Sequence, residues 1–168
     1  MQSISYEGAL KLLRRLKELV IVIMVVLLLH YFFPIYITSG ASMTNTICDK
    51  DLVLGFRFYG ELSQGDIITG VQSANGSNKT VIKRVIGLSG DHVIIKDNKV
   101  YVNGTELQED YLYEEMSTAD LDVIVPFDCV FVMGDNRNVS YDSRQADCVK
   151  LSTISSKVLF NISSWQCY

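Results

Sequence analysis

Histidine is scarce in this sequence, which contains only His30 and His92. His30 lies inside a long apolar run. His92 follows Gly90-Asp91, and the residues around it do not resemble a Ser-His-Asp triad signature. We therefore interpret His92 as a surface residue of a hairpin. The scarcity argues against catalysis by histidine and directs the search for a general base to other side chains.

Other common signatures are missing as well. The sequence has no Cys-x-x-Cys pair and no cluster of histidines, so we expect neither a zinc site nor any other cofactor. It has no Gly-x-Gly-x-x-Gly or P-loop spacing and no internal repeat. With 168 residues, 48% hydrophobic and 20% charged, it is neither disordered nor repetitive. These values predict one small domain with at most a short appendage.

The longest apolar run extends from Leu19 to Ile37 and carries no formal charge apart from His30. As a helix it would span roughly 28 Å, close to the hydrocarbon thickness of a bilayer. A buried core helix, the alternative, is usually shorter and carries a polar stripe. We therefore expect a cytoplasmic N-terminus at residues 1–18, a transmembrane anchor at residues 19–38 and an extracytoplasmic β-rich domain at residues 39–168.

Charge predicts the orientation of this anchor. Residues 1–18 have a net charge of +2, which leaves −6 for the rest of a chain whose total is −4. Because basic flanks stay in the cytoplasm, we expect a single-pass protein of the plasma membrane with residues 39–168 outside. We do not expect an acidic exported domain to bind nucleic acid, because both carry negative charge. A cleavable signal peptide ending at the small residues 38–41 is the rival interpretation.

Four cysteines lie in the expected extracytoplasmic domain, where oxidising surroundings permit disulfides. They are Cys48, Cys129, Cys148 and Cys167. Four cysteines allow three pairings, and the sequence does not rank them.

Short β-prone segments separated by turns follow the apolar run. The expected strands are Leu52–Leu54, Ile67–Ile68, Thr80–Ile86, His92–Ile95, Val100–Val102, Val123–Val125 and Cys129–Met133. We interpret residues 72–79 and 106–122 as loops, and residues 151–157 as one or two helical turns. Because helices do not alternate with the strands, the sequence predicts a mostly β domain, a β-barrel or sandwich, rather than an α/β sheet.

Lys83 lies in the middle of the strand expected at Thr80–Ile86, between Val81 and Val85 on one face. A lysine in this position either reaches water from an edge strand or is buried. Burial would lower the pKa of its amine, and a neutral amine can take the proton of a serine hydroxyl. The residues alone leave both alternatives open.

Three segments stand out by their order along the chain: Ser39–Thr46 directly after the apolar run, Lys83–Asp91, and Met133–Arg144. They resemble the type I signal peptidase pattern of a Ser-Met box, a Lys-Arg-Val-Ile-Gly-x-x-Gly-Asp box and a Gly-Asp-Asn-Arg-x-x-Ser-x-Asp-Ser-Arg box. Gly65-Asp66-Ile67 matches a shorter element of the same family. The resemblance covers most of residues 36–160. It implies a mostly β catalytic core of the signal peptidase I type, held against a bacterial membrane by a single anchor.

The resemblance also implies a mechanism. Ser42 would attack the scissile carbonyl of a preprotein, and Lys83 would act as its general base. The expected supporting residues are Ser140, which orients the lysine amine, Asp142 and Arg144, which form a salt bridge, and Arg84, which follows the base. The enzyme would be a serine endopeptidase without cofactor. Its partners would be preproteins with signal peptides, the lipid bilayer and the export translocon.

Family members cut after small residues at positions −1 and −3 of exported precursors. Thr38 and Ile82 match positions that shape the pockets for those residues, and Met43 lies next to them. The backbone N–H of Ser42 would contribute to the oxyanion hole, with Gly40 as a further candidate.

The chain departs from the family pattern near the nucleophile. Gly40 stands where some members have a serine whose hydroxyl helps the oxyanion hole, and Asn45 stands where many have proline. After Arg144 the usual aromatic and glycine are replaced by Ala146 and Asp147. The departures at Gly40 and Asn45 motivate a second hypothesis, a non-catalytic relative that binds export-pathway proteins. A third is a peptidase dedicated to few substrates, such as pilin-like or sortase-dependent precursors. A self-cleaving repressor shares the Ser/Lys chemistry but would need a DNA-binding segment in place of the anchor.

Overall fold

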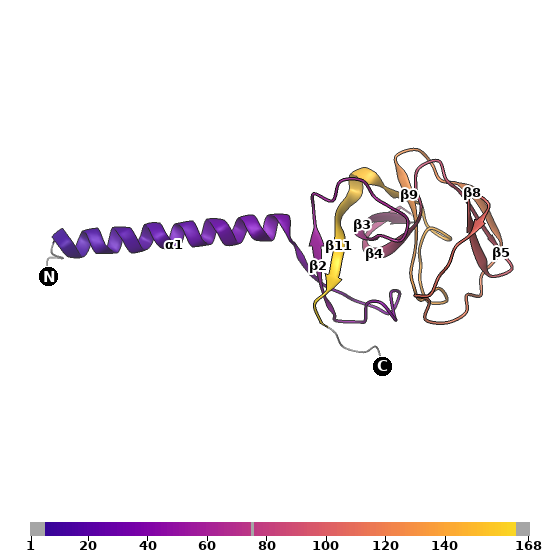
Figure 1. The fold of residues 1–168 in the computed structure, drawn as a ribbon, viewed down its shortest axis with the longest axis horizontal. Coiled ribbons are helices and arrows are strands. Elements are labelled where there is room, and N and C mark those ends of the chain that lie inside the picture. The colour runs from indigo at the N-terminus through magenta and orange to yellow at the C-terminus, as the bar shows by residue number, and fades with distance from the viewer. Residues whose placement is uncertain (1–5, 75, 164–168) are drawn as a thin grey trace.

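The computed structural model describes residues 6–74 and 76–163. One long helix, α1 (Tyr6–Phe32), projects from a body of β-strands (Figure 1). None of its side chains is buried. Within the described ranges, no helix combines the length and the apolar character that a membrane span requires.

The helix ends earlier than the anchor expected at residues 19–38. Proline disfavours helical conformation in the residue before it and cannot continue the hydrogen-bond ladder, so α1 ends at Phe32, two residues before Pro34. Residues Ile35–Ile37 then form a strand. The last part of the expected anchor therefore belongs to the β body.

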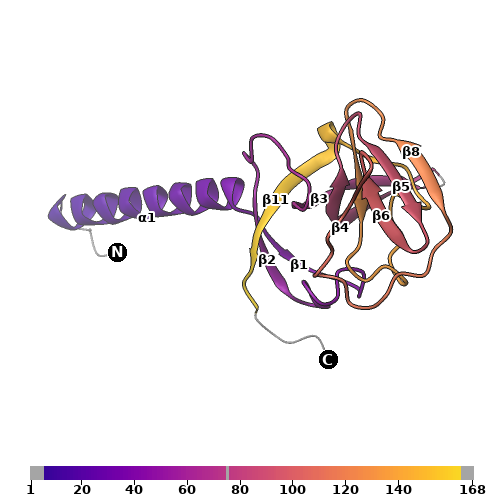
Figure 2. The same cartoon turned by 45° about the vertical axis from the view of Figure 1, so that its right-hand side comes forward.

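The larger sheet has seven antiparallel strands in the order β1-β2-β11-β3-β4-β9-β10. They are β1 (Ile35–Ile37), β2 (Leu52–Phe56), β3 (Ile67–Ala74), β4 (Ser77–Gly87), β9 (Cys129–Met133), β10 (Val149–Lys150) and β11 (Ile154–Asn161). Figure 2 shows β11 as a long curved strand beside β2 and β3. The C-terminal strand therefore joins the segment after α1 to the rest of the sheet.

The smaller sheet has four antiparallel strands in the order β7-β6-β5-β8. They are β5 (His92–Lys96), β6 (Lys99–Val102), β7 (Thr105–Glu106) and β8 (Leu121–Ile124). Asp97 and Asn98, the two turn residues between β5 and β6, both have positive φ. Such a pair suits the twist of a tight hairpin, as the sequence predicted at this place.

The expectation of a mostly β domain is confirmed, with corrections. Among the described residues neither sheet closes on itself, so the closed alternative is wrong. A loop was expected at residues 72–79, but residues 72–74 continue β3 and residues 77–79 begin β4, and the two segments pair with each other. Residues 151–157 were expected to be helical, but only the 3₁₀ turn Leu151–Thr153 is, and β11 follows. Pairing of β11 with both β2 and β3 outweighs the local preference of this segment.

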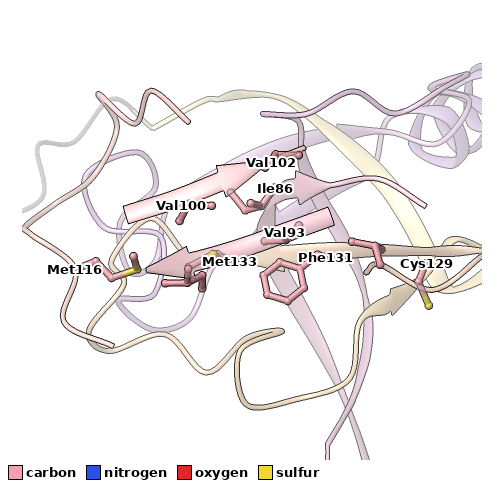
Figure 3. Close-up of a cluster of buried hydrophobic side chains, with 10 residues drawn as sticks. Ile86, Val93, Val100, Val102, Met116, Cys129, Phe131 and Met133 are labelled. Atoms are coloured by element: carbon pink, nitrogen blue, oxygen red, sulfur yellow. The ribbon is translucent and has the colours of Figure 1, made fainter. Parts of the chain in front are cut away.

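Three groups of buried apolar side chains hold the body together. The largest lies between the two sheets and includes Ile86, Val93, Phe131 and Met133 (Figure 3). A second surrounds Ile68, Val85 and Val130 within the larger sheet. The third consists of Met43, Ile47 and Val53 and lies beneath the turn that carries Ser42. The third group therefore supports the turn that carries Ser42.

Candidate active site

Ser42 lies in a turn that follows β1, and apolar neighbours fix that turn. Met43 is 4% exposed and Ile47 3%, because both side chains enter the third core group. The N–H of Ile47 donates to the carbonyl of Met43 at 2.8 Å, which closes one helical turn. The N–H of Thr38 donates to the carbonyl of Asp51 at 2.9 Å and joins the two ends of the loop. The segment around Ser42 is thus held at both ends and along its buried face.

Lys83 lies on β4, which has β3 on one side and β9 on the other, and its side chain is 4% exposed. The structure therefore selects the buried alternative for this lysine. Its Nζ donates to the Oγ of Ser42 at 2.6 Å. Burial lowers the pKa of the Lys83 amine, because desolvation penalises the charged form, whereas the carboxylates of Asp142 and Asp135 oppose that shift. A lysine of this kind is suited to accept a serine proton.

The segment after β9 holds Ser42 from the other side. The N–H of Asn136 donates to the carbonyl of Ser42 at 3.0 Å. Gly134 lies against the same carbonyl: a Cβ at this position would come within 3.0 Å of the Ser42 carbonyl oxygen and of the Ser140 hydroxyl. Only glycine allows the two segments to approach this closely.

Ser140 occupies the place expected for an orienting residue, but its hydroxyl is not engaged. The residue is buried, and its Oγ has no hydrogen-bond partner among the described residues. A bond from Ser140 to the Lys83 amine is therefore absent from this structure. A buried hydroxyl without a partner carries a desolvation cost of about 1–3 kcal/mol, and such costs are typical of sites that engage a partner during function.

Asp142 and Arg144 form the expected salt bridge, which is buried and bidentate. The Nε of Arg144 donates to Oδ1 of Asp142 at 2.8 Å, and Nη2 donates to Oδ2 at 2.9 Å. Asp142 also accepts the N–H of Gly134 at 2.9 Å, and Arg144 donates to the carbonyl of Ser140 at 3.3 Å. The pair therefore fixes the backbone on both sides of the site.

Arg84 points away from Lys83 into a second ion pair. Its Nε and Nη2 donate to the two carboxylate oxygens of Asp135 at 2.8 and 2.6 Å, and Nη1 donates to the carbonyl of Gly65 at 2.9 Å. The guanidinium lies 3.9 Å from the ring centre of Tyr111. Thr46, four residues after the nucleophile, also donates to Asp135. Arg84 thus links the lysine strand, the nucleophile turn and the Met133–Arg144 box.

Arg137 connects a further segment to the site. Its side chain is 1% exposed, and it donates to Glu109 and, at 2.9 Å, to the carbonyl of Gly134. Glu109 belongs to the acidic segment that we interpreted as a loop. Its pairing fastens that segment beside the site.

A cleft of about 350 Å³ opens next to the Ser42–Lys83 pair. Thr38, Met43 and Ile82, the three residues that the family resemblance assigned to the substrate pocket, all line this cleft. The hydroxyl of Thr38 donates to the carbonyl of Cys48 at 2.5 Å, so it is turned toward its own loop. The cleft is small, and apolar side chains form much of its wall.

The two departures at the nucleophile turn have a common backbone explanation. Gly40 has φ 97° and Asn45 has φ 87°, a region that side chains disfavour and that a proline ring cannot adopt. A serine at position 40 or a proline at position 45 would strain this turn. The N–H of Gly40 donates to the carboxylate of Asp49 at 2.8 Å and therefore does not point into an oxyanion hole here.

Several residues of the site were not assigned a role from the sequence. Asp135 and Asn136 lie inside the recognised box, so the box itself was the available signal. Glu109 and Tyr111 lie in a segment without a local pattern, and only the fold brings them to the site. No group of His, Cys, Asp or Glu side chains in the described part of the chain is arranged to hold a metal ion.

Comparisons with known proteins identify the family of this chain. A family model described as "Signal peptidase, peptidase S26" matches residues 12–164. Signal peptidase I of Bacillus amyloliquefaciens is 34% identical over 139 residues, which cover 75% of this chain and 73% of that protein. Signal peptidase I S of Bacillus subtilis (strain 168) is 36% identical over 143 residues, 76% of each chain. The crystal structure of a signal peptidase I from Enterococcus faecalis V583 has 32% identity and a TM-score of 0.51, and covers 58% of this chain and 97% of that one.

The sequence relatives and the arrangement of the boxes define a serine peptidase, a hydrolase of peptide bonds. The chain belongs to the signal peptidase family, peptidase S26, and within it to the type I signal peptidases.

Proposed function

We propose that this peptidase removes N-terminal signal peptides from exported preproteins by a Ser42/Lys83 dyad mechanism. The neutral amine of Lys83 takes the hydroxyl proton as Ser42 attacks the scissile carbonyl, which gives an acyl-enzyme. The ammonium then returns the proton to the leaving amine. Lys83 next activates the water that hydrolyses the ester. The observation that carries the proposal is the 2.6 Å contact between Lys83 Nζ and Ser42 Oγ, made by an amine that is 4% exposed.

The supporting residues keep this contact in place. The Asp142–Arg144 pair holds the backbone of Gly134 and Ser140, and Arg84 connects Lys83's strand to Asp135. We propose that the Ser140 hydroxyl turns to the Lys83 amine when substrate binds and excludes water. We assign the oxyanion hole to the backbone N–H of Ser42. Gly40 would join it only after its bond to the Asp49 carboxylate is released.

The cleft beside the dyad supports specificity for small side chains at positions −1 and −3. Its volume is about 350 Å³, and Met43, Ile82 and Thr38 lie in its wall. A bulky residue would collide with these side chains. We therefore propose that alanine at −1 is cleaved and leucine at −1 is rejected, because a pocket of fixed size excludes the larger group.

We further propose that α1 holds the enzyme at the plasma membrane, with the β domain on the extracytoplasmic side. The apolar side chains of α1 from Leu19 to Leu29 are all exposed, and the basic residues of this chain end lie before them. The bilayer and the preprotein would then be the two partners. Ser42 follows α1 by only ten residues, so the dyad lies close to the helix end.

The decisive experiment measures cleavage of a purified preprotein with a small-x-small site by the full-length enzyme in detergent micelles. Ser42→Ala and Lys83→Met should each reduce cleavage to background, while both variants keep the wild-type far-UV circular dichroism spectrum. Lys50→Met is the matched control, because Lys50 is an exposed lysine of the nucleophile loop. Near-normal activity of Lys83→Met would disprove the dyad. An intact site that binds preprotein but never cleaves it would favour the non-catalytic alternative.

A further inference from the structure

Two cysteines outside the dyad lie side by side at the join between two strands. Cys129 is the first residue of β9, and Cys148 directly precedes β10. The two strands are antiparallel, with Lys150 opposite Cys129 and Val149 opposite Val130. Cys129 is 5% exposed and lies at one end of the largest core group (Figure 3). Cys148 packs against the same group. Their positions are therefore set by the sheet and by the core.

The two side chains are free thiols that lie close to one another. Neither is part of a disulfide, and the nearby Cys129 thiol is one of the groups that raise the pKa of Cys148. Cys48 is already disulfide-bonded, so it does not compete for either thiol. Cys167 lies outside the described residues. Of the three pairings that the sequence allows, the structure favours one that joins Cys129 to Cys148.

We propose that Cys129 and Cys148 are a redox modification site, which a low-molecular-weight disulfide such as glutathione disulfide converts to an intramolecular disulfide. Geometry supports this pair because both cysteines are held at adjacent strand ends. Cys148 lies outside the paired residues of β10, so ladder hydrogen bonds do not prevent its backbone from making the small shift that bond formation needs.

Exposure determines the order of the two steps. Cys148 is half-buried and lines a cleft of about 580 Å³, so its thiolate meets the small disulfide first. It attacks one sulfur of glutathione disulfide, forms a mixed disulfide and releases one glutathione thiolate. The thiolate of Cys129 then attacks the sulfur of Cys148 and expels the second glutathione. Two protein thiols are oxidised to one disulfide, one glutathione disulfide is reduced to two glutathione thiols, and the two protons of the protein thiols pass to the two glutathione thiolates.

The same surroundings predict a slow reaction and a durable product. Burial, followed by the neighbouring Cys129, raises the pKa of the Cys148 thiol to about 12. Little thiolate exists near neutral pH, so uncatalysed oxidation is slow and accelerates as the pH rises. Stabilisation of a thiolate would favour the reduced form of the pair, and the Cys148 thiol is not stabilised in this way. We therefore expect the bond to act as a structural disulfide rather than as an exchange catalyst.

The bond would close the segment 129–148, which contains most of the residues that frame the dyad. Gly134, Asn136, Ser140, Asp142 and Arg144 all lie between the two cysteines. Cross-linking the ends of a segment of this length restricts the unfolded chain and stabilises the folded one. We expect the oxidised enzyme to melt about 5–10 °C higher than the reduced enzyme, from the usual stabilisation by such loops. Its catalytic rate should be unchanged within about twofold, because the bond lies outside the cleft of the dyad.

The test uses the full-length enzyme in detergent micelles, oxidised with excess glutathione disulfide at about pH 9, where thiolate is more abundant. After blocking of remaining thiols and denaturation, trypsin under non-reducing conditions should release a linked pair of peptides, residues 100–137 and 145–150. Reduction should separate them and lower the melting temperature by the same 5–10 °C or so. Cys148→Ala should lose both the linked pair and the oxidation-dependent shift in melting temperature.

Two results would overturn the proposal. One is that Cys129 and Cys148 both remain open to alkylation, in the unfolded protein, after prolonged oxidation. The other is that either cysteine is found linked to a peptide containing Cys48 or Cys167 instead. Cys129→Ala is the second variant, because it removes the buried partner and should leave Cys148 as a mixed disulfide with glutathione, detected by its added mass. These readouts do not depend on peptidase activity.

Discussion

The backbone N–H of Asn136 donates to the carbonyl of Ser42 across 3.0 Å, which joins the last box of the sequence to the first. Lys83, from the middle box, donates to the hydroxyl of the same serine. One residue is therefore fixed by two segments that enter the site from different strands, β4 and the end of β9. Such double fixation is the arrangement that positioning of a nucleophile requires.

The lowered pKa of Lys83 predicts the pH dependence of both activity and stability. The value of kcat/KM should rise about tenfold per pH unit up to that pKa and then level off, at a pH below the 10.5 of an ordinary lysine. Between the two values the unfolded chain binds more protons than the folded one, so the free energy of unfolding rises with pH. Urea titrations should show this rise in the wild type and a smaller one in Lys83→Met. A pH–rate profile that levels off only above pH 10.5 would contradict the assignment.

Ser140→Ala separates a positioning role from a structural one. The hydroxyl has no partner in this structure, so its removal should leave the free energy of unfolding unchanged or raise it by about 1 kcal/mol. If the hydroxyl turns to Lys83 during catalysis, kcat should fall at least about tenfold while KM stays near the wild-type value. Ser143→Ala is the matched control: Ser143 accepts the N–H of Val132 at 3.1 Å, so this variant should lose stability but keep kcat. Unchanged kcat in Ser140→Ala would exclude the orienting role.

Gly134→Ala tests the close approach of the two segments. The added Cβ would come within 3.0 Å of the Ser42 carbonyl and the Ser140 hydroxyl, so the nucleophile must move. A shift of about 1 Å in a reacting group can cost about a hundredfold in rate, and we expect a loss of that size in kcat/KM. Gly104→Ala introduces a strained residue in a remote hairpin turn, where nothing lies near the new Cβ. That control should melt earlier yet cleave preprotein normally, and equal activity of the two variants would refute the prediction.

Asn45→Pro would restore the residue that many family members have, and we expect it to harm this enzyme. Proline requires φ near −65°, whereas Asn45 has φ 87°. The turn would have to change its backbone, at a cost of roughly 1–3 kcal/mol, and Ser42 would lose its place. Asn45→Gly should leave stability and cleavage close to the wild-type values, because glycine adopts positive φ freely. Wild-type activity in Asn45→Pro, measured in the same preprotein assay, would contradict this account.

The sequence predicted which residues lie together better than it predicted the strand boundaries. The three boxes named Ser42 and Lys83, which are in contact, and Asp142 and Arg144, which form an ion pair. Their catalytic roles stay a prediction. The burial of Lys83 was not predictable from Val81 and Val85 alone, since an edge strand has the same alternation. It depends on β9, which lies far along the chain and covers the other side of β4.

Residues 151–157 show the opposite case. Their composition allowed a helix. Residues 154–161 form a strand because they lie between β2 and β3 and pair with both. The same limit applies to Glu109 and Tyr111, whose partners Arg137 and Arg84 are distant in sequence. Long-range pairing decides such segments, and local patterns do not report it.

The place of β11 has a consequence for the timing of biosynthesis. The turn that carries Ser42 belongs to the β1–β2 side of the sheet and Lys83 belongs to β4. Among the described residues, the strand between β2 and β3 is the one formed by Ile154–Asn161. Residues 154–161 are among those added late in synthesis. The strand pairing that joins the Ser42 side of the sheet to the Lys83 side can therefore form only after these residues have been made.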